Sequence, residues 1–317
     1  MKPISPIAAL TALSILFAAC ATSGSAGTMP PLEPAPSVAQ GSPDLTPAPT
    51  NTPALPTSAP GSSPQPTPAP SSDGTSIVRA YFYLESIPGS SGLVPVLREV
   101  PATKAVATAA MAALLDGPIA SEGGAMSSAV PGGTRLLGLT VANGIATVDL
   151  SSEFESGGGS ASALIRLGQV VYTLTQFPTV SEVAFRVDGR PVTVFGSEGI
   201  VLDGPVGRAA YLDLLPAIFV DRPAYRAALG NPGRVTGSAQ GVFEATFMVT
   251  LVDGAGRMVA EKQVMAACMC DSGAFEATIA YDVPRAQWGT LRVWAGSAQD
   301  GSAILVREYP VWLTPAS

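Results

Sequence analysis

A proline-rich segment near the N-terminus sets the strongest limit on what this chain can fold into. Residues 21–75 contain no aromatic residue, no Lys and no Arg, and about a quarter of them are proline. Such a segment cannot bury enough apolar surface to offset the conformational entropy that folding removes. We therefore expect residues 20–75 to form an extended, partly polyproline II tether, with folded structure only after it.

The first residues are typical of an export signal. Lys2 precedes an apolar run at 7–17, which is shorter than the roughly 20 residues that span a bilayer. Two alanines then lead directly to Cys20, which resembles the lipobox of bacterial lipoproteins. In that motif the cysteine thiol receives a diacylglycerol and becomes the mature N-terminus. We expect a signal peptide at 1–19, lipid attachment at Cys20, and a protein held on the extracytoplasmic face of the cell membrane. An ordinary secretory signal cleaved near Ala19 is the alternative.

The composition argues against several classes of function. The chain of 317 residues contains no histidine, which removes the commonest general base, the commonest metal ligand and every Ser-His or Cys-His nucleophile pair. Its formal net charge is −7, whereas nucleic-acid binding requires a basic surface. We expect no cofactor, no metal and no nucleic-acid partner.

Residues 76–215 show the mixed periodicity of an α+β domain. Asn-Gly at 143–144 and Asp-Gly at 188–189 indicate two hairpin turns, and Ser160 is expected to cap the second helix. The expected order is ββαββαββ, with helices packed on a mixed or antiparallel sheet. The elements are strands at 77–84 and 93–100, a helix at 103–116, strands at 135–141 and 145–150, a helix at 160–177, and strands at 183–187 and 191–195.

Residues 216–317 lose helical periodicity and show short strand patterns about ten residues apart. This spacing predicts an all-β, immunoglobulin-like sandwich of antiparallel strands. The expected strands are 234–239, 243–252, 258–265, 275–281, 291–295 and 304–313. The residues expected on one face of the second strand are Phe243, Ala245, Phe247, Val249 and Leu251.

Motifs in both domains resemble known modules. The first domain resembles the GerMN domain of sporulation and germination lipoproteins, and the second resembles the immunoglobulin-like domain of bacterial spore germination that often follows it. The motifs of the first are Gly132-Gly133-Thr134-Arg135-Leu136-Leu137, the run 144–151, Leu174-Thr175-Gln176-Phe177-Pro178 and Val187-Asp188-Gly189. Those of the second are the runs 235–239, 242–245, 273–275 and 296–302. The resemblance implies a fold similar to the ring-building modules of secretion systems and no enzymatic activity as a rule.

Cys268 and Cys270 are the only cysteines besides Cys20. Alternation along a strand would place both side chains on one face, near the upper limit of the Cα separation in disulfides. Three interpretations stay open: a local disulfide in a loop, two reduced buried thiols, or a soft-metal site completed by Met265 or Met269.

Asp149, Glu153 and Glu155 gather at the end of an expected strand. Two such carboxylates could serve as the acid and base of a glycoside hydrolase, or could bind Ca²⁺. Neighbouring serines and the glycine run 157–159 favour a solvated loop instead. The same glycines precede a helix but lack the Lys of a phosphate-binding loop.

We therefore expect a non-enzymatic, lipid-anchored envelope protein that mediates assembly or docking. Its partner would be another envelope protein or a second copy of the chain. The alternative is a module for cell-wall carbohydrate or peptidoglycan, or a weak hydrolase. In that case Trp288, Trp294 and Trp312 could form a sugar-binding strip, although tryptophans in a sandwich more often pack in its core or seam.

We predict that Cys20→Ala releases the protein from the membrane or leaves its signal peptide uncleaved, because the substitution removes the only thiol at the lipid-attachment position. Labelling of cells with a clickable fatty acid measures the modification directly. Labelling of the Cys20→Ala variant as strong as that of the parent chain would contradict the anchor.

Overall fold

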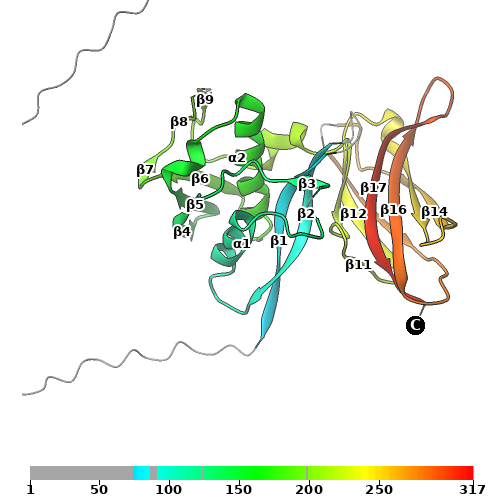
Figure 1. The fold of residues 1–317 in the computed structure, drawn as a ribbon. Coiled ribbons are helices and arrows are strands. Elements are labelled where there is room, and N and C mark those ends of the chain that lie inside the picture. The colour runs from blue at the N-terminus through cyan, green and yellow to red at the C-terminus, as the bar shows by residue number, and fades with distance from the viewer. Residues whose placement is uncertain (1–73, 86–90, 123, 198, 271, 317) are drawn as a thin grey trace, which may run out of the picture. The chain divides into compact units, whose positions relative to one another are not determined.

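The computed structural model describes most of the chain after the proline-rich segment (Figure 1). The described ranges are 74–85, 91–122, 124–197, 199–270 and 272–316. They belong to one of the two units into which the chain divides, residues 66–317. The expected signal peptide, the lipidated Cys20 and residues 21–73 of the expected tether lie outside the described residues. The expected end of the tether at 75 is wrong by one residue, because Thr75 already begins the first strand. Among the described helices, none has the length and apolarity needed to cross a bilayer.

The first sheet of the α+β region is built on a long hairpin. Strands β1 (Thr75–Leu84) and β2 (Gly92–Pro101) pair antiparallel along their whole length, and β3 (Met126–Ser127) joins the other edge of β1. The outer edge of β2 is met by Tyr225, whose amide donates to the Pro95 carbonyl at 2.9 Å and which forms a parallel bridge with Val96.

A second sheet has the order β4-β5-β6-β7. Its strands are β4 (Leu136–Ala142), β5 (Ile145–Leu150), β6 (Glu182–Val187) and β7 (Arg190–Pro191). The β4–β5 hairpin turns at Asn143 and Gly144, which both have positive φ angles, as the Asn-Gly pattern predicted. Strands β5 and β6 are parallel, because a helix connects them, so the sheet is mixed.

Helices α1 (Val106–Leu115) and α2 (Ser160–Leu174) pack against β1 and against each other. The C-terminal half of α2 is buried on every side, which anchors it in the domain core. Phe154, in a 3₁₀ turn at Ser152–Glu155, lies between Phe185 and Phe195, with ring centroids 6.2 and 5.2 Å away. Burial of each such ring contributes about 1.5–3 kcal/mol.

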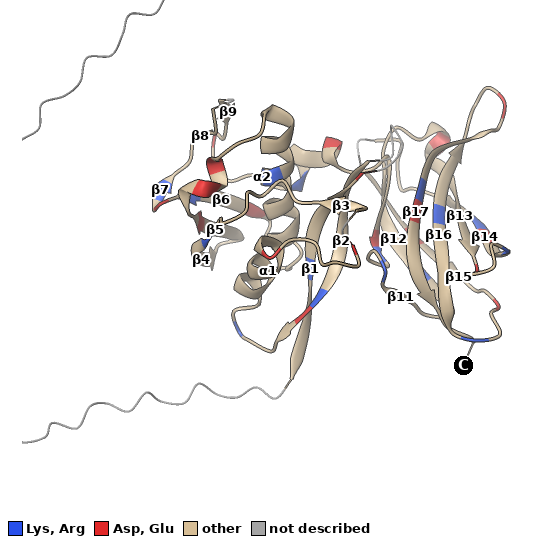
Figure 2. Cartoon of the chain, in the orientation of Figure 1, with Lys and Arg blue, Asp and Glu red and all other residues tan. Residues whose placement is uncertain are grey.

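The strands from residue 218 onward form two sheets of an immunoglobulin-like sandwich, as expected from the sequence. One has the order β10-β12-β15 and the other β11-β17-β16-β13-β14. The strands of the first are β10 (Ile218–Arg222), β12 (Gly233–Ala239) and β15 (Gly273–Ile279). Those of the second are β11 (Ala228–Leu229), β13 (Thr246–Val252), β14 (Met258–Met265), β16 (Gln287–Gly296) and β17 (Ala303–Leu313). Few charged residues interrupt the strands, which are mostly tan in Figure 2.

Three local expectations are wrong. Ser160 begins α2 and does not cap it, since the extended Gly159 takes the cap position. The expected strand 191–195 is broken. Val192 still donates to the Phe185 carbonyl of β6 at 3.0 Å, and β8 (Val194–Phe195) then pairs with β9 (Ile200–Val201). Phe243 does not share the buried face of β13. It lies in a short 3₁₀ turn with positive φ angles at the next two residues, and 63% of it is exposed.

Gly237, in the middle of β12, gives a sharp test of the sandwich. A Cβ atom there would lie 1.8 Å from the Phe219 carbonyl oxygen and 2.9 Å from the Phe275 ring. Gly237→Ala should therefore cost at least about 3 kcal/mol of the free energy of unfolding. At Gly296 an added Cβ has room, so Gly296→Ala should change the free energy of unfolding by less than about 1 kcal/mol. Urea unfolding of both variants measures the difference, and equal effects would contradict the register of β10 and β12.

Candidate functional site

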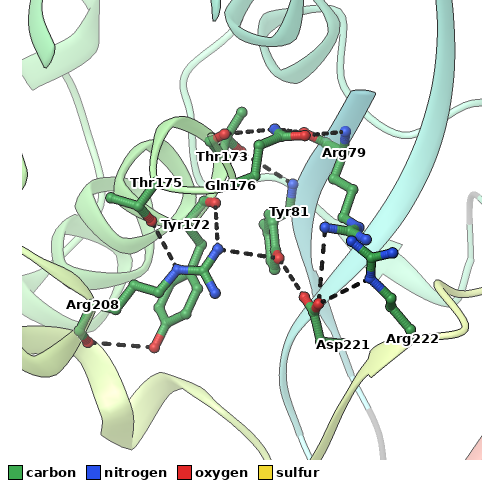
Figure 3. Close-up of polar contacts among 9 residues, drawn as sticks. All are labelled: Arg79, Tyr81, Tyr172, Thr173, Thr175, Gln176, Arg208, Asp221 and Arg222. Carbon is green, nitrogen blue, oxygen red and sulfur yellow. Dashed lines mark hydrogen bonds and ion pairs between the residues drawn. The ribbon is translucent and has the colours of Figure 1, made fainter. Parts of the chain in front are cut away.

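A buried phenol joins the α+β region to the sandwich (Figure 3). Tyr81 lies on β1 and has no exposed surface. Its amide donates to Thr173 Oγ1 at 3.2 Å, and its carbonyl accepts from Gln169 Nε2 at 2.9 Å, which ties the strand to α2. Its hydroxyl donates to Asp221 Oδ1 on β10 at 2.8 Å. The bond joins residues 140 positions apart.

Asp221 is an ionic partner as well as an acceptor. Its Oδ2 lies 3.8 Å from Arg79 Nη1 and 3.9 Å from Arg222 Nε. Burial, followed by the negative charge of Asp221, raises the pKa of Tyr81 well above its usual value of 10. The phenol therefore stays protonated near neutral pH and acts as a donor, not as a base.

Arg208 approaches the same phenol from the 3₁₀ segment Arg208–Leu214. Its Nε donates to Thr175 Oγ1 at 2.8 Å, and its Nη2 donates to the Tyr172 carbonyl at 3.3 Å and the Tyr81 hydroxyl at 3.5 Å. The guanidinium also lies over both rings, 4.9 Å from the Tyr172 centroid and 5.6 Å from that of Tyr81. Every acceptor is neutral, and within the described ranges no carboxylate forms an ion pair with Arg208.

A cleft of about 600 Å³ opens beside Arg208. Its lining combines apolar rings, small strand residues and charged groups, among them Tyr172, Arg208, Phe219, Asp221, Phe275 and Glu276. Both carboxylates are already neutralised, because Glu276 accepts two hydrogen bonds of 2.7 Å from Arg234 and Asp221 is paired as described above. Among the charged residues described at this cleft, Arg208 is the one with no ion pair to a described carboxylate.

The chemistry of the cleft is that of binding. Burial raises the pKa of Tyr172 to about 12, so this phenol also remains protonated near neutral pH. Leu212 and Ala274 offer accessible apolar surface in the cleft, and a guanidinium with no ion pair to a described carboxylate can bind an incoming carboxylate in charge-assisted hydrogen bonds.

The two cysteines singled out in the sequence lie elsewhere. Cys268 and Cys270 are exposed in the loop between β14 and β15, where the structure joins their sulfur atoms and places their Cα atoms 5.2 Å apart. Whether these cysteines are oxidised in the cell stays a prediction. In the described part of the chain, no three Cys, Asp or Glu side chains converge as a metal centre would require.

Asp149, Glu153 and Glu155 each have surroundings of their own. Asp149 Oδ1 accepts a hydrogen bond of 3.0 Å from the Gly189 amide, and this bond stabilises the β6–β7 turn. The Ser151 hydroxyl lowers the pKa of Glu153, whereas a general acid needs a raised value. Of the three carboxylates, only Glu155 lines a shallow cleft.

The tryptophans do not form a continuous strip. Trp288 and Trp312 meet edge to face with centroids 5.3 Å apart, and the Arg226 guanidinium covers the Trp288 ring at 4.6 Å. Trp294 lies six residues along β16, about 20 Å away at the rise of an extended strand, and donates to Thr250 Oγ1 at 3.1 Å.

The two regions match separate families. Residues 79–193 match the family described as Germane, sporulation and spore germination. Residues 217–302 match Gmad2, the immunoglobulin-like domain of bacterial spore germination. The chain carries a Germane domain followed by a Gmad2 domain. Both descriptions name sporulation or germination, and neither names a reaction. Tyr81 thus belongs to the Germane domain, Asp221 to the Gmad2 domain, and Arg208 to the segment between them.

Solved structures include similar GerMN domains. The first GerMN domain of the sporulation protein GerM from Bacillus subtilis is 20% identical, over 42% of this chain and 98% of that one, with a TM-score of 0.37. The tandem GerMN domains of the same protein are 15% identical, over 60% of each chain, also with a TM-score of 0.37. A search of curated proteins finds no match.

The Tyr81–Asp221 bond predicts a contrast between two conservative substitutions. Tyr81→Phe removes a hydrogen bond to the partly exposed Asp221 carboxylate. It should lower the free energy of unfolding by about 1.5–3 kcal/mol, the range for hydrogen bonds to charged groups. Tyr172→Phe removes only a bond of 3.4 Å to the Arg208 carbonyl and should cost less than about 1 kcal/mol. Urea unfolding of both variants provides the measurement, and losses of equal size would show that the Tyr81 hydroxyl is not the main polar link.

Proposed function

We propose that the protein is a lipid-anchored, non-enzymatic envelope protein that docks another envelope protein in the cleft beside Arg208. The observation that carries the proposal is the charge balance of the cleft. Asp221 and Glu276 have cationic partners, whereas Arg208 meets only neutral acceptors. A partly buried cation without a counterion favours an occupant that brings a carboxylate.

The occupant that fits is a polypeptide segment with an acidic side chain next to an apolar one. None of the hydrogen bonds from Arg208 to described residues uses Nη1, so this nitrogen can donate to an incoming carboxylate. Half-buried Leu212 and exposed Ala274 supply the apolar surface for the neighbouring side chain, whereas Phe219 and Phe275 are buried. Arg208 is held in place by Thr175 and by two rings, so binding requires little ordering of its long side chain.

The envelope location belongs to this proposal on sequence grounds alone. The signal-like segment, the small residues before Cys20 and the proline-rich composition of 20–75 support a lipid anchor followed by a tether. A coil of that length has an end-to-end distance of about 40 Å, which would bring the cleft within reach of other membrane-bound proteins.

A photo-crosslinking residue at Ala274 tests the cleft in living cells. Ala274 is exposed and lines the cleft, whereas Met258 is equally accessible but lies on β14, outside it. We expect the full-length chain to crosslink one envelope protein from position 274 and not from position 258. The mapped peptide should contain Asp or Glu beside an apolar residue.

Two arginine variants supply the control. Arg208→Gln should lower the crosslinking yield from position 274 at least several-fold, because it removes the guanidinium charge that would bind the partner's carboxylate. Arg285→Gln, which changes an exposed arginine outside the cleft, should leave the yield unchanged. Equal yields from both variants would refute docking at Arg208. Crosslinking to glycan together with cosedimentation on purified peptidoglycan would support the cell-wall alternative instead.

A further inference from the structure

The loop between β14 and β15 presents a cysteine pair at the surface of the Gmad2 domain. Cys268, Met269 and Cys270 are all exposed. Both ends of the loop are held by the sheets, because Ala266 donates to the Ala245 carbonyl and Ala267 to the Ala274 carbonyl, each at 2.8 Å. The sulfur atoms therefore occupy a defined place that a large reactant can approach.

A bond between these two cysteines adds little to the fold. It closes a loop of only three residues, and the stabilisation from a disulfide rises with the length of chain that it encloses. The Ala267–Ala274 hydrogen bond already encloses the same loop. A structural role therefore does not account for the pair. Exposed disulfides with no such role are the ones that exchange readily with thiols.

A small apolar cleft adjoins the sulfur atoms. Its volume is about 290 Å³, and its walls contain both cysteines with Val242, Phe243 and Met269. Phe243 and Met269 are 63% and 73% exposed, so two large apolar side chains face solvent at this cleft. Among the described residues that line it, none is charged. This surface fits an apolar stretch of an incompletely folded polypeptide, which would place a cysteine of that polypeptide beside the pair.

We propose that Cys268 and Cys270 form a thiol–disulfide exchange site that oxidises cysteine pairs in polypeptides. A substrate thiolate attacks one sulfur, forms a mixed disulfide and displaces the other cysteine as a thiolate. A second substrate thiolate then attacks the substrate sulfur of the mixed disulfide and displaces the remaining cysteine. The substrate loses two protons and two electrons and gains a disulfide, and the pair becomes two thiols. A small-molecule disulfide such as oxidised glutathione restores the pair for another cycle.

The full chain with Cys20→Ala tests the site, because it retains only these two cysteines. The probe is a reduced synthetic peptide with two cysteines flanked by apolar residues. Its comparison peptide carries serines in place of the apolar residues. We expect one equivalent of apolar probe to be oxidised per chain, at least ten times faster than the comparison peptide. Replacing both cysteines by serine should abolish the transfer.

Two further variants separate binding from chemistry. Phe243→Ser should slow oxidation of the apolar probe about tenfold, and Met258→Ser, which changes an exposed methionine outside the cleft, should not. A probe with one of its two cysteines replaced by serine should accumulate as a mixed disulfide with the chain, visible by mass spectrometry, because it lacks the second thiol that completes the exchange. Oxidation no faster than by free oxidised glutathione, or a fall of 5 °C or more in Tm when both cysteines are replaced (roughly 1 kcal/mol), would overturn the proposal. Neither outcome bears on docking at Arg208, which lies in a separate cleft.

Discussion

The polar contacts between the Germane and Gmad2 domains depend on the hydrogen bond from Tyr81 to Asp221. A phenol without exposed surface must find an acceptor, because a buried donor left unpaired costs about 1–3 kcal/mol. The acceptor comes from the first strand of the Gmad2 domain, and its charge is balanced from both sides by Arg79 and Arg222. Those contacts pair Asp221 with two arginines, while the Arg208 guanidinium lies over the rings of Tyr81 and Tyr172.

Much of the fold could be predicted from the sequence, because its determinants are local. The Asn143-Gly144 turn and the alternating burial of β15 and β16 depend on residues next to one another in the chain. The failures are also local, but they depend on backbone geometry that periodicity does not encode. Phe243 fits the alternation of β13, yet the left-handed residues that follow it remove it from the strand.

The site could not be predicted in the same way. Tyr81, Arg208 and Asp221 come from a strand, a 3₁₀ segment and another domain, and no spacing pattern relates positions so far apart. Each residue alone has an ordinary explanation as a strand aromatic or a surface charge. The cysteine pair is the opposite case. Its spacing is visible in the sequence, whereas its exposure and the apolar cleft beside it emerge only in three dimensions.

The contact of Tyr225 with β2 has a consequence for solubility. As the end strand of its sheet, β2 would offer unpaired backbone groups to a neighbouring molecule, which is how sheets join into aggregates. Pro95 and Pro101 remove two amides from that strand, and the Tyr225 amide already uses the Pro95 carbonyl. Tyr225 of the Gmad2 domain thus covers part of an exposed strand edge of the Germane domain, which lowers the tendency of this edge to pair with another molecule.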